Sequence, residues 1–326
     1  MDLSIVVPVY NEVENVEILC DRIHESLSVI GRSYEVLLVD DGSSDGTWDK
    51  LVALSKKYPN LHLIHFRGNF GQTAAMSAGI RESNGDIIVT MDADLQNDPS
   101  DIPLLLECIN RGADVASGWR KDRKDKFLSR RLPSIIANKL ISKITGITLH
   151  DYGCTLKAYR REVIKDVHLY GEMHRFIPAL ASWVGATVDE VIVKHYPRIA
   201  GESKYGISRT LRVVLDLLTV KFLLRYSRGP IQIFGKIGMI FGFPGLLLLL
   251  GMILAHLSHL LLGTEFAAGL VKRPFWIMSS FMLIFFGVQF VCMGLLAEIQ
   301  IRTWYESQDK ATYVIKETVK SSRASN

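Results

Sequence analysis

The chain has 326 residues, of which 48% are apolar and 22% are charged. This composition excludes a disordered chain, a collagen-like repeat and a small disulfide scaffold. The net charge of +4 is too small and too dispersed for a nucleic-acid-binding protein, but it suits an anionic membrane surface or an anionic substrate. The mean hydropathy of +0.18 is higher than a soluble enzyme needs, so part of the chain is expected to lie in a membrane.

The first part of the chain alternates between two hydrophobic patterns. Short runs rich in β-branched residues predict strands, and amphipathic stretches between them predict helices. Strands are expected over residues 3–9, 34–40, 61–66 and 86–91, and helices from residue 12 to about 30, over 47–57 and over 71–82. This alternation is typical of a doubly wound α/β domain with a mostly parallel sheet. Such sheets bind ligands beyond the carboxyl ends of their strands, which directs attention to residues 10–12, 40–43, 67–69 and 92–94.

An acidic pair at the end of the fourth strand is the strongest local signal. Asp92 and Asp94 are one residue apart, and the amide of Gln96 offers a further oxygen ligand. Carboxylates placed in this way can hold Mg²⁺ or Mn²⁺, which can bridge them to a diphosphate. Solvated loop carboxylates are commoner than metal ligands, but the position at a strand end favours the metal site.

A second acidic pair, Asp40 and Asp41, ends the second strand. The following Asp45, Gly46 and Thr47 suit a turn and the start of a helix. Turn chemistry does not account for Asp40 and Asp41, and hydrogen bonds to a nucleotide base or ribose would.

Two apolar segments near the C-terminus predict membrane spans. No Asp, Glu, Lys or Arg occurs between Lys236 and Glu265, or between Arg273 and Glu298. Each gap exceeds the roughly 20 apolar residues that cross a bilayer, and spans are expected near residues 234–260 and 275–298. Before them, residues 208–228 interleave apolar and basic residues, as in a helix lying at a membrane interface.

The distribution of basic residues predicts the orientation in the membrane. Six Lys and Arg residues lie between Ser203 and Pro230, five follow Gln300, and two lie between the spans. The positive-inside rule then places the large domain and the C-terminal tail in the cytoplasm. The tail after Asp309 is polar and is expected to be poorly ordered.

The cysteines and the N-terminus agree with a cytoplasmic catalytic part. Cys20, Cys108, Cys154 and Cys292 are scattered and form no CxxC pair, so neither a zinc cluster nor a disulfide framework is expected. Met1 is followed at once by a strand-like segment, and no secretory signal is expected.

Several motifs, in this order and spacing, resemble glycosyltransferase family 2 with a GT-A fold. They are Val7 to Glu12, the segment VDDGSSDGT, Arg67 to Gly71, and Asp92 to Gln96. The later part resembles the polyprenyl-phosphate glycosyltransferases, a branch that includes dolichol-phosphate mannose synthase, bactoprenol glucosyltransferase and undecaprenyl-phosphate aminoarabinose transferase. The later motifs are His150 to Cys154, Tyr159 to Arg161, Arg175 to Pro178, and Gly201 to Tyr205.

The resemblance implies a domain organisation and a donor site. It implies a GT-A catalytic domain over residues 1–205, an amphipathic juxtamembrane region over 206–230, two transmembrane helices over 231–300 and a cytoplasmic tail over 301–326. The residues expected to border the nucleotide are Pro8, Tyr10, Glu12, Asp40 or Asp41, Gln72 and Asp92. The metal and the donor diphosphate would be held by Asp92, Asp94 and Gln96.

The resemblance also implies a cationic acceptor site. The residues expected around the acceptor phosphate are Arg120, Arg130 or Arg131, Arg198, Ser203 and Lys204. Basic side chains suit a phosphate on physical grounds, although each taken singly is more commonly a solvated surface residue. Asp151, which matches an acidic position near the acceptor, is added to the catalytic set of Asp92, Asp94, Arg120, Arg131, Arg198 and Lys204. A turn preceding Gly153 would also account for Asp151.

The expected function is inverting transfer of a single sugar from a UDP- or GDP-linked donor to a polyprenyl monophosphate, undecaprenyl or dolichyl, at the cytoplasmic face of the inner membrane. Glucose, mannose, N-acetylhexosamine and aminoarabinose donors are all compatible with these motifs. A homo-oligomer is also compatible with the sequence. Two alternatives stay open. One is a membrane-bound transferase or polysaccharide synthase acting on a hydroxyl, which would need a general base. The other is a non-catalytic membrane assembly partner.

Overall fold

A computed structural model of the chain describes residues 1–121, 138, 141–142, 146–165, 167, 169, 173–183, 185–197, 230–263, 274–306 and 315–319. The chain divides into two compact units. Residues 1–221 together with residues 311–326 belong to one unit, and residues 222–310 belong to the other.

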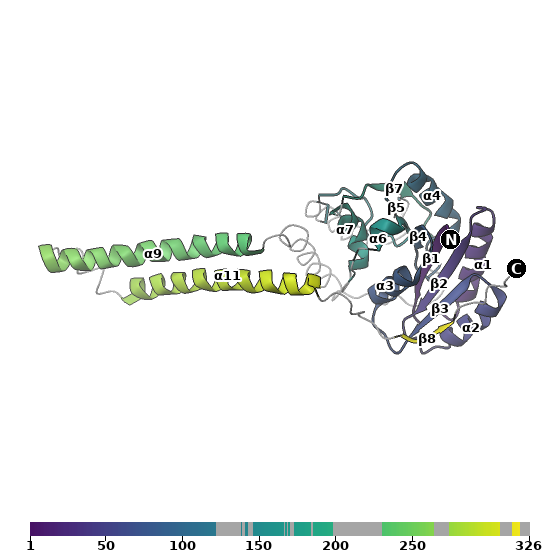
Figure 1. Cartoon of the computed structure of the whole chain (residues 1–326), viewed down its shortest axis with the longest axis horizontal. Helices are drawn as coiled ribbons and strands as arrows, with labels where there is room; N and C mark the ends of the chain where they lie inside the picture. Colours follow the sequence, from purple (N-terminus) through teal and green to yellow (C-terminus); the bar gives the residue numbers. More distant parts are fainter. Residues whose placement is uncertain are drawn as a thin grey trace. The chain divides into compact units, whose positions relative to one another are not determined.

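The first unit is built on an eight-stranded sheet with the strand order β7-β5-β6-β4-β1-β2-β3-β8 (Figure 1). The strands are β1 (Leu3–Val9), β2 (Tyr34–Asp40), β3 (Leu61–Phe66), β4 (Ile87–Thr90), β5 (Val115–Trp119), β6 (Lys157–Arg160), β7 (Val188–Ile192) and β8 (Ile315–Val319). β1 is parallel to β2 and β4, β2 to β3, and β5 to β7. β6 is antiparallel to β4 and β5, and β8 to β3. The α/β class is therefore confirmed, but the sheet is mixed rather than mostly parallel.

Helices connect the strands and cover both faces of the sheet. They are α1 (Val16–Ser28), α2 (Thr47–Lys57), α3 (Gln72–Glu82), α4 (Ile102–Asn110), α6 (Arg161–Ile164) and α7 (Ile177–Trp183), with short 3-10 helices at Pro99–Asp101 and Met173–Phe176. α1 packs against α2, α3 packs on β1 and β2, and α4 packs on β5 and β6. A connection between two parallel strands must cross one face of the sheet, which is where these helices lie.

The central strands are buried on both faces, which explains their continuous apolar runs. On β2, Leu38 joins the larger core cluster with α1, α2 and α4, while Val39 joins a smaller cluster with Ala74, Ala75 and Ala78 of α3. α3 lies very close to the sheet, because a Cβ added at Gly79 would be 2.3 Å from the Val6 Cγ1 atom. Small residues on one face of α3 therefore bring its N-terminus close to the strand ends.

The predicted boundaries agree closely with the structure in this unit. The strands expected over 3–9, 34–40 and 61–66 and the helix over 47–57 are confirmed. The fourth strand is shorter, at Ile87–Thr90, and the first helix begins only at Val16 because residues 10–15 form a loop.

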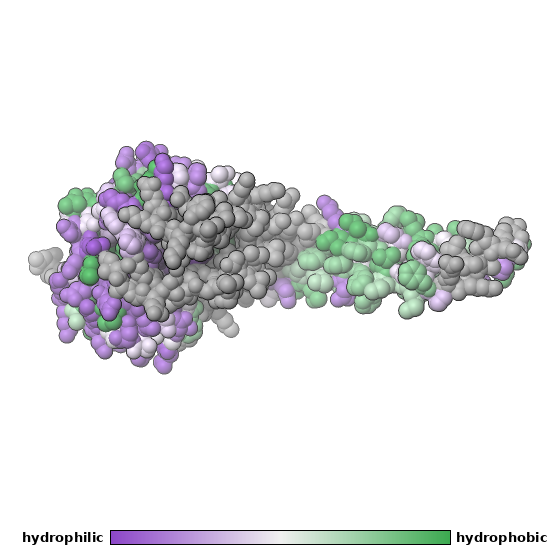
Figure 2. All heavy atoms as spheres, turned by 180° about the vertical axis from the view of Figure 1, so that it is seen from behind, coloured by the Kyte–Doolittle hydropathy of each residue, from purple (hydrophilic) through white to green (hydrophobic). Residues whose placement is uncertain are grey.

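The second unit consists of two long helices, α9 (Pro230–Leu262) and α11 (Pro274–Glu306). Their segments Phe234–Leu261 and Pro274–Ala297 are long and apolar enough to cross a membrane, with mean hydropathies of 2.4 and 2.1. Figure 2 shows apolar side chains on the outward surface of the described parts of both helices. The helices approach closely at Gly242 and Gly287, since a Cβ on Gly287 would lie 2.6 Å from the Gly242 Cα atom, as is common between membrane helices.

The C-terminal tail differs from the sequence expectation. Residues Ile315–Val319 are not disordered but form β8, which pairs with the edge strand β3 in the register Leu63 with Val319 and His65 with Glu317. An edge strand offers unpaired backbone groups, and β8 supplies their partners. The expectation of a poorly ordered tail is therefore wrong for these five residues.

Candidate active site

Three strand ends bring the predicted donor residues to one edge of the sheet. β1, β2 and β4 are parallel neighbours, so the residues that follow them emerge on the same side. Asp41 is tied to the end of β1 by a 2.9 Å hydrogen bond from its amide to the Val9 carbonyl. The loops after β1, β2 and β4 therefore lie at the same edge of the sheet.

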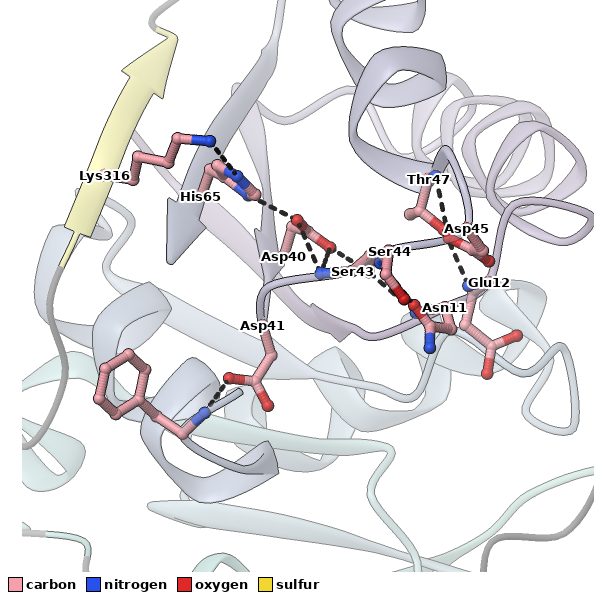
Figure 3. Close-up of polar contacts among 11 residues, drawn as sticks. Asn11, Glu12, Asp40, Asp41, Ser43, Ser44, Asp45, Thr47, His65 and Lys316 are labelled. Carbon is pink, nitrogen blue, oxygen red and sulfur yellow. Dashed lines mark hydrogen bonds and ion pairs between the residues drawn. The ribbon is translucent and has the colours of Figure 1, made fainter. Parts of the chain in front are cut away.

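The loops after β1 and β2 are joined by several polar contacts (Figure 3). The Asn11 amide donates to Ser43 Oγ at 2.9 Å, and the Ser44 amide donates to Asn11 Oδ1 at 2.9 Å. The Glu12 amide donates to Thr47 Oγ1 at 3.0 Å. Asn11 adopts a left-handed conformation with φ of 53°, which Asn tolerates better than most residues. The VDDGSSDGT segment thus also fixes the shape of the neighbouring loop.

The Asp40 carboxylate is hydrogen-bonded to other side chains inside the protein. The side chain is fully buried, its Oδ2 atom lies 2.6 Å from His65 Nδ1, and its Oδ1 atom accepts a short hydrogen bond from the Ser43 hydroxyl. The geometry gives Asp40 a structural role in the loop after β2. The sequence expectation placed Asp40 or Asp41 at the base, and His65 was not anticipated.

Asp41 points away from Asp40 and toward the loop after β3 (Figure 3). Its two carboxylate oxygens accept hydrogen bonds from the amides of Phe70 at 2.7 Å and Gly71 at 2.9 Å. Burial raises the pKa of Asp41, and these two amides oppose the shift. Gly42 permits this packing, because a Cβ there would lie 2.5 Å from the backbone of Gly68.

Pro8, Tyr10 and Glu12 lie in β1 or in the loop that follows it. Pro8 lies within β1 and is buried, while Tyr10 and Glu12 are partly exposed in the loop. The Glu12 carboxylate accepts a 2.6 Å hydrogen bond from the side-chain amide of Asn15, which precedes α1. Glu12, which is predicted to border the nucleotide, therefore also supports the start of α1.

Asp92 and Asp94 follow β4 as an acidic pair, in which Asp94 is buried and Asp92 is partly exposed. The side-chain amide of Gln72, the first residue of α3, donates to Asp92 Oδ1 at 2.6 Å. The backbone amide of Gln96 donates to Asp94 Oδ1 at 3.2 Å. Burial is the main cause of the pKa of Asp92 rising to about 6, and the charge of Asp94 adds to it. Gln72, which was expected at the nucleotide, thus contacts the acidic pair directly.

The acidic pair fits a divalent cation, because a cation would relieve the repulsion between two neighbouring carboxylates. Within the part of the chain that the structure describes, no group of three or more His, Cys, Asp or Glu side chains is placed to hold a metal ion. An ion at Asp92 and Asp94 would therefore need further oxygen ligands. The side-chain amide of Gln96, a diphosphate or water could supply them.

Arg120 lies near enough to Asp92 for its charge to act on that carboxylate, and it is paired with Asp151. Arg120 directly follows β5, and its guanidinium binds the Asp151 carboxylate at 2.7 Å. The charge of Arg120 acts to lower the pKa of Asp92, as does the charge of Arg175. Arg175 belongs to the motif Arg175 to Pro178, which is part of the family resemblance but received no predicted role. The remaining predicted acceptor residues, Arg130, Arg131, Arg198, Ser203 and Lys204, lie outside the described residues.

Sequence reasoning also missed Lys157, a buried lysine in β6. Its side chain is 2% exposed, and its ammonium donates to the Tyr152 carbonyl at 3.2 Å. Burial lowers the pKa of Lys157 to about 8. The available signal was a lysine within the otherwise apolar stretch Leu156 to Tyr159.

Comparisons with known proteins agree with this architecture. The family model described as Glycosyl transferase family 2 matches residues 4–168. Dodecaprenyl-phosphate galacturonate synthase of Rhizobium johnstonii is 42% identical, over 97% of this chain and 93% of that protein. Undecaprenyl-phosphate 4-deoxy-4-formamido-L-arabinose transferase of Edwardsiella ictaluri is 37% identical, over 98% of this chain and 95% of that protein.

Solved structures support the fold. Glucosyl-3-phosphoglycerate synthase from Mycobacterium tuberculosis, in a complex with Mn²⁺, uridine diphosphate and glucosyl-3-phosphoglycerate, is similar with a TM-score of 0.53 and 17% identity, over 68% of this chain and 79% of that chain. The GT-A-like fold is thus confirmed. From the family match and the relatives that align over nearly their whole length, this chain belongs to glycosyl transferase family 2.

Proposed function

We propose that this glycosyltransferase transfers one sugar from a nucleotide-diphosphate sugar to a polyprenyl monophosphate, with inversion at the anomeric carbon. The observation that carries the proposal is the full-length similarity to two transferases whose names specify dodecaprenyl or undecaprenyl phosphate, because the aligned region includes the two apolar helices. Those helices give the catalytic domain a means of staying beside a lipid whose tail remains in the bilayer.

On the donor side, Asp41 is the better candidate for contact with the nucleotide base. Asp40 is committed to His65 and Ser43, whereas Asp41 faces the loop after β3 and keeps lone pairs beyond those used by two backbone amides. Tyr10 and Glu12 border the same loops. The uridine diphosphate named for a structure of similar fold supports a UDP-linked rather than a GDP-linked donor.

The diphosphate would be held at Asp92, Asp94 and Gln96, the residues suited to Mg²⁺ or Mn²⁺. A bound divalent cation would neutralise charge on the leaving diphosphate. Gln72 fixes the orientation of the Asp92 carboxylate through its 2.6 Å hydrogen bond, so α3 positions this site. The Mn²⁺ named with a structure of similar fold supports metal dependence.

On the acceptor side, a phosphate oxygen attacks the anomeric carbon in line with the leaving diphosphate. The phosphate is anionic near neutral pH, so the chain need not supply a strong base, and its contribution is positioning and charge stabilisation. We assign this to Arg120, Arg130 or Arg131, Arg198, Ser203 and Lys204. The Tyr196 amide donates to the Gln96 carbonyl at 2.9 Å, so the segment after β7 lies beside the proposed metal site.

We further propose that the protein crosses the inner membrane twice, with its catalytic domain in the cytoplasm. β8 follows the second apolar helix yet pairs with β3 of the catalytic unit, so both ends of the helical pair must return to the same side. An even number of crossings satisfies this constraint. The excess of basic residues at both ends of the pair favours the cytoplasmic side.

The test is a transfer assay with full-length protein in lipid nanodiscs. A panel of labelled UDP-sugars and GDP-mannose is incubated with undecaprenyl phosphate or, as a matched control, with undecaprenol lacking the phosphate. The panel includes UDP-galacturonate and the UDP derivative of 4-deoxy-4-formamido-L-arabinose. We expect an acid-labile, lipid-extractable product with the phosphate only. Product with undecaprenol would favour a hydroxyl acceptor, and no transfer from any donor would favour a non-catalytic partner.

A further inference from the structure

Asp40 and His65 form a buried pair between β2 and β3. The two residues are partners in the parallel register of these strands, so their side chains project on the same face of the sheet. The His65 Nδ1 atom lies 2.6 Å from Asp40 Oδ2. Because the carboxylate accepts, Nδ1 carries the proton, and Nε2 of a neutral imidazole is left as an acceptor on the opposite side of the ring.

His65 is held from two further directions. Its ring stacks on Trp48 of α2, with ring centroids 4.4 Å apart and planes 17° apart. On its outer side, the Lys316 ammonium of β8 lies 3.4 Å from Nε2, and backbone pairing of β8 with β3 brings that lysine to the histidine. The imidazole is thus fixed between a helix, the C-terminal strand and Asp40.

The contacts continue from Asp40 to the two loops after β1 and β2. Asp40 accepts from the Ser43 hydroxyl, and Ser43 Oγ in turn accepts from the Asn11 amide. Figure 3 shows this series of contacts running from Lys316 through His65 and Asp40 to Asn11. These loops carry Tyr10, Glu12 and Asp41, the residues proposed to border the nucleotide.

We propose that His65 is a positioning residue for the donor nucleotide, and that Lys316 extends this role to the C-terminal strand. The inference rests on the proposed function. A buried carboxyl group requires hydrogen-bond partners, and without His65 the Asp40 side chain would turn toward water and release Ser43. The strand that follows the apolar helices thereby becomes part of the support of the donor site. The reacting groups at Asp92 and Asp94 are held by other contacts.

The experiment compares two variants. His65→Leu removes the N–H that donates a hydrogen bond to Asp40, and His65→Asn retains an N–H near the position of Nδ1. Lys316→Met tests the contribution of β8. Matched controls are His62→Asn on the same strand, where the imidazole faces Glu35 at 3.6 Å, and Thr318→Ala on β8. Each full-length variant is titrated with UDP and GDP by calorimetry, and KM for donor, KM for acceptor, kcat and Tm are measured.

We expect His65→Leu to weaken nucleotide binding and raise the donor KM roughly tenfold, an effect of the size that loss of a buried charged hydrogen bond produces. His65→Asn should recover most of this affinity, and Lys316→Met should weaken binding about twofold, because an exposed contact contributes little. The acceptor KM and kcat should stay near the wild-type values. Both control variants should bind nucleotide as the wild type does.

Other outcomes separate the failure of this inference from that of the proposed function. Wild-type nucleotide affinity in a folded His65→Leu variant would overturn the positioning role. Equal increases in both KM values with a lowered Tm, and no recovery in His65→Asn, would also overturn it by indicating a general loss of structure. If the wild-type protein binds neither nucleotide and transfers no sugar, the proposed function itself is wrong.

Discussion

Arg120 and Asp151 form a two-point ion pair. Arg120 Nε donates to Asp151 Oδ2 at 2.7 Å, and Nη2 donates to Oδ1 at 3.0 Å, while the side chains are only 11% and 3% exposed. The parallel bonds match the planar guanidinium to the carboxylate and restrict the arginine to one orientation. The proposed anionic acceptor has no obligatory proton to lose, so we propose that Asp151 orients Arg120 and does not act as a base.

The first prediction concerns this pair. Asp151→Asn keeps the shape of the side chain but removes its charge and turns one acceptor oxygen into a donor facing Arg120. We expect kcat to fall about tenfold or more with little change in donor affinity, because the misplaced arginine acts mainly in the transition state. Steady-state kinetics with undecaprenyl phosphate varied at saturating donor, together with donor calorimetry, measure both effects.

Arg120→Lys is the companion variant, since it keeps the charge and loses the two-point geometry. Loss of turnover in both variants, with preserved secondary structure, would agree with the orienting role. Wild-type acceptor kinetics in both would contradict it. Breaking a buried pair also costs on the order of 3–5 kcal/mol of stability, so Tm must be measured beside the kinetics.

The second prediction concerns the metal. Asp94→Ala removes one carboxylate of the acidic pair, and we expect at least a roughly 1,000-fold loss of transfer with the fold retained, since cationic charge stabilisation is worth several kcal/mol. Asp98→Ala is a suitable control, because its side chain caps the short helix at Pro99–Asp101 and lies outside the acidic pair. The assay is run with Mg²⁺, with Mn²⁺ and in excess chelator. Full activity in chelator would contradict metal dependence.

The elements that the sequence predicted best are those with a purely local signal. β1, β2 and β3 are continuous apolar runs bounded by polar loops, and α2 has a clear apolar stripe. β8 has no such signal, because Ile315–Val319 is largely exposed and is defined by pairing with a strand about 250 residues earlier. Edge pairing of this kind depends on the assembled sheet and not on local periodicity.

The same distinction applies to the site. Asp92 and Asp94 are predictable as candidate metal ligands because two carboxylates end an apolar strand, which is visible in the sequence. The different roles of Asp40 and Asp41 depend on the register of β2 with β3, which places His65 beside Asp40. Gln72 reaches Asp92 only because α3 lies close to the sheet at Gly79. Spatial neighbours of this kind require the tertiary structure.

The third prediction concerns topology. Cys20, Cys108 and Cys154 are buried, so a Cys292→Ser background leaves few reactive thiols. In intact cells, single cysteines at Glu25 in α1 and Thr318 in β8 should both resist a membrane-impermeant maleimide, and should react after permeabilisation. Thr264→Cys, between the apolar segments, should react in intact cells. Different accessibility of the positions in α1 and β8 would contradict an even number of crossings.

The last prediction concerns the pH dependence of stability caused by Lys157. Burial lowers its pKa in the folded protein from the ordinary 10.5 to about 8, and its ammonium is held by the Tyr152 carbonyl at 3.2 Å. Between these two pH values the unfolded chain binds more protons at this residue than the folded protein does. Stability due to Lys157 therefore rises as pH increases from about 8 to 10.5 and is constant below and above that window.

The measurement compares wild type with Lys157→Met, whose side chain has similar length and does not titrate. Because all other lysines are shared, their titration cancels in the difference. We expect the stability of the wild type relative to Lys157→Met to increase on the order of 3 kcal/mol across the window, followed as the difference in Tm in one detergent. A difference that stays constant from pH 7 to 10.5 would mean that Lys157 keeps its ordinary pKa, and that solvent reaches this part of β6 despite its 2% exposure.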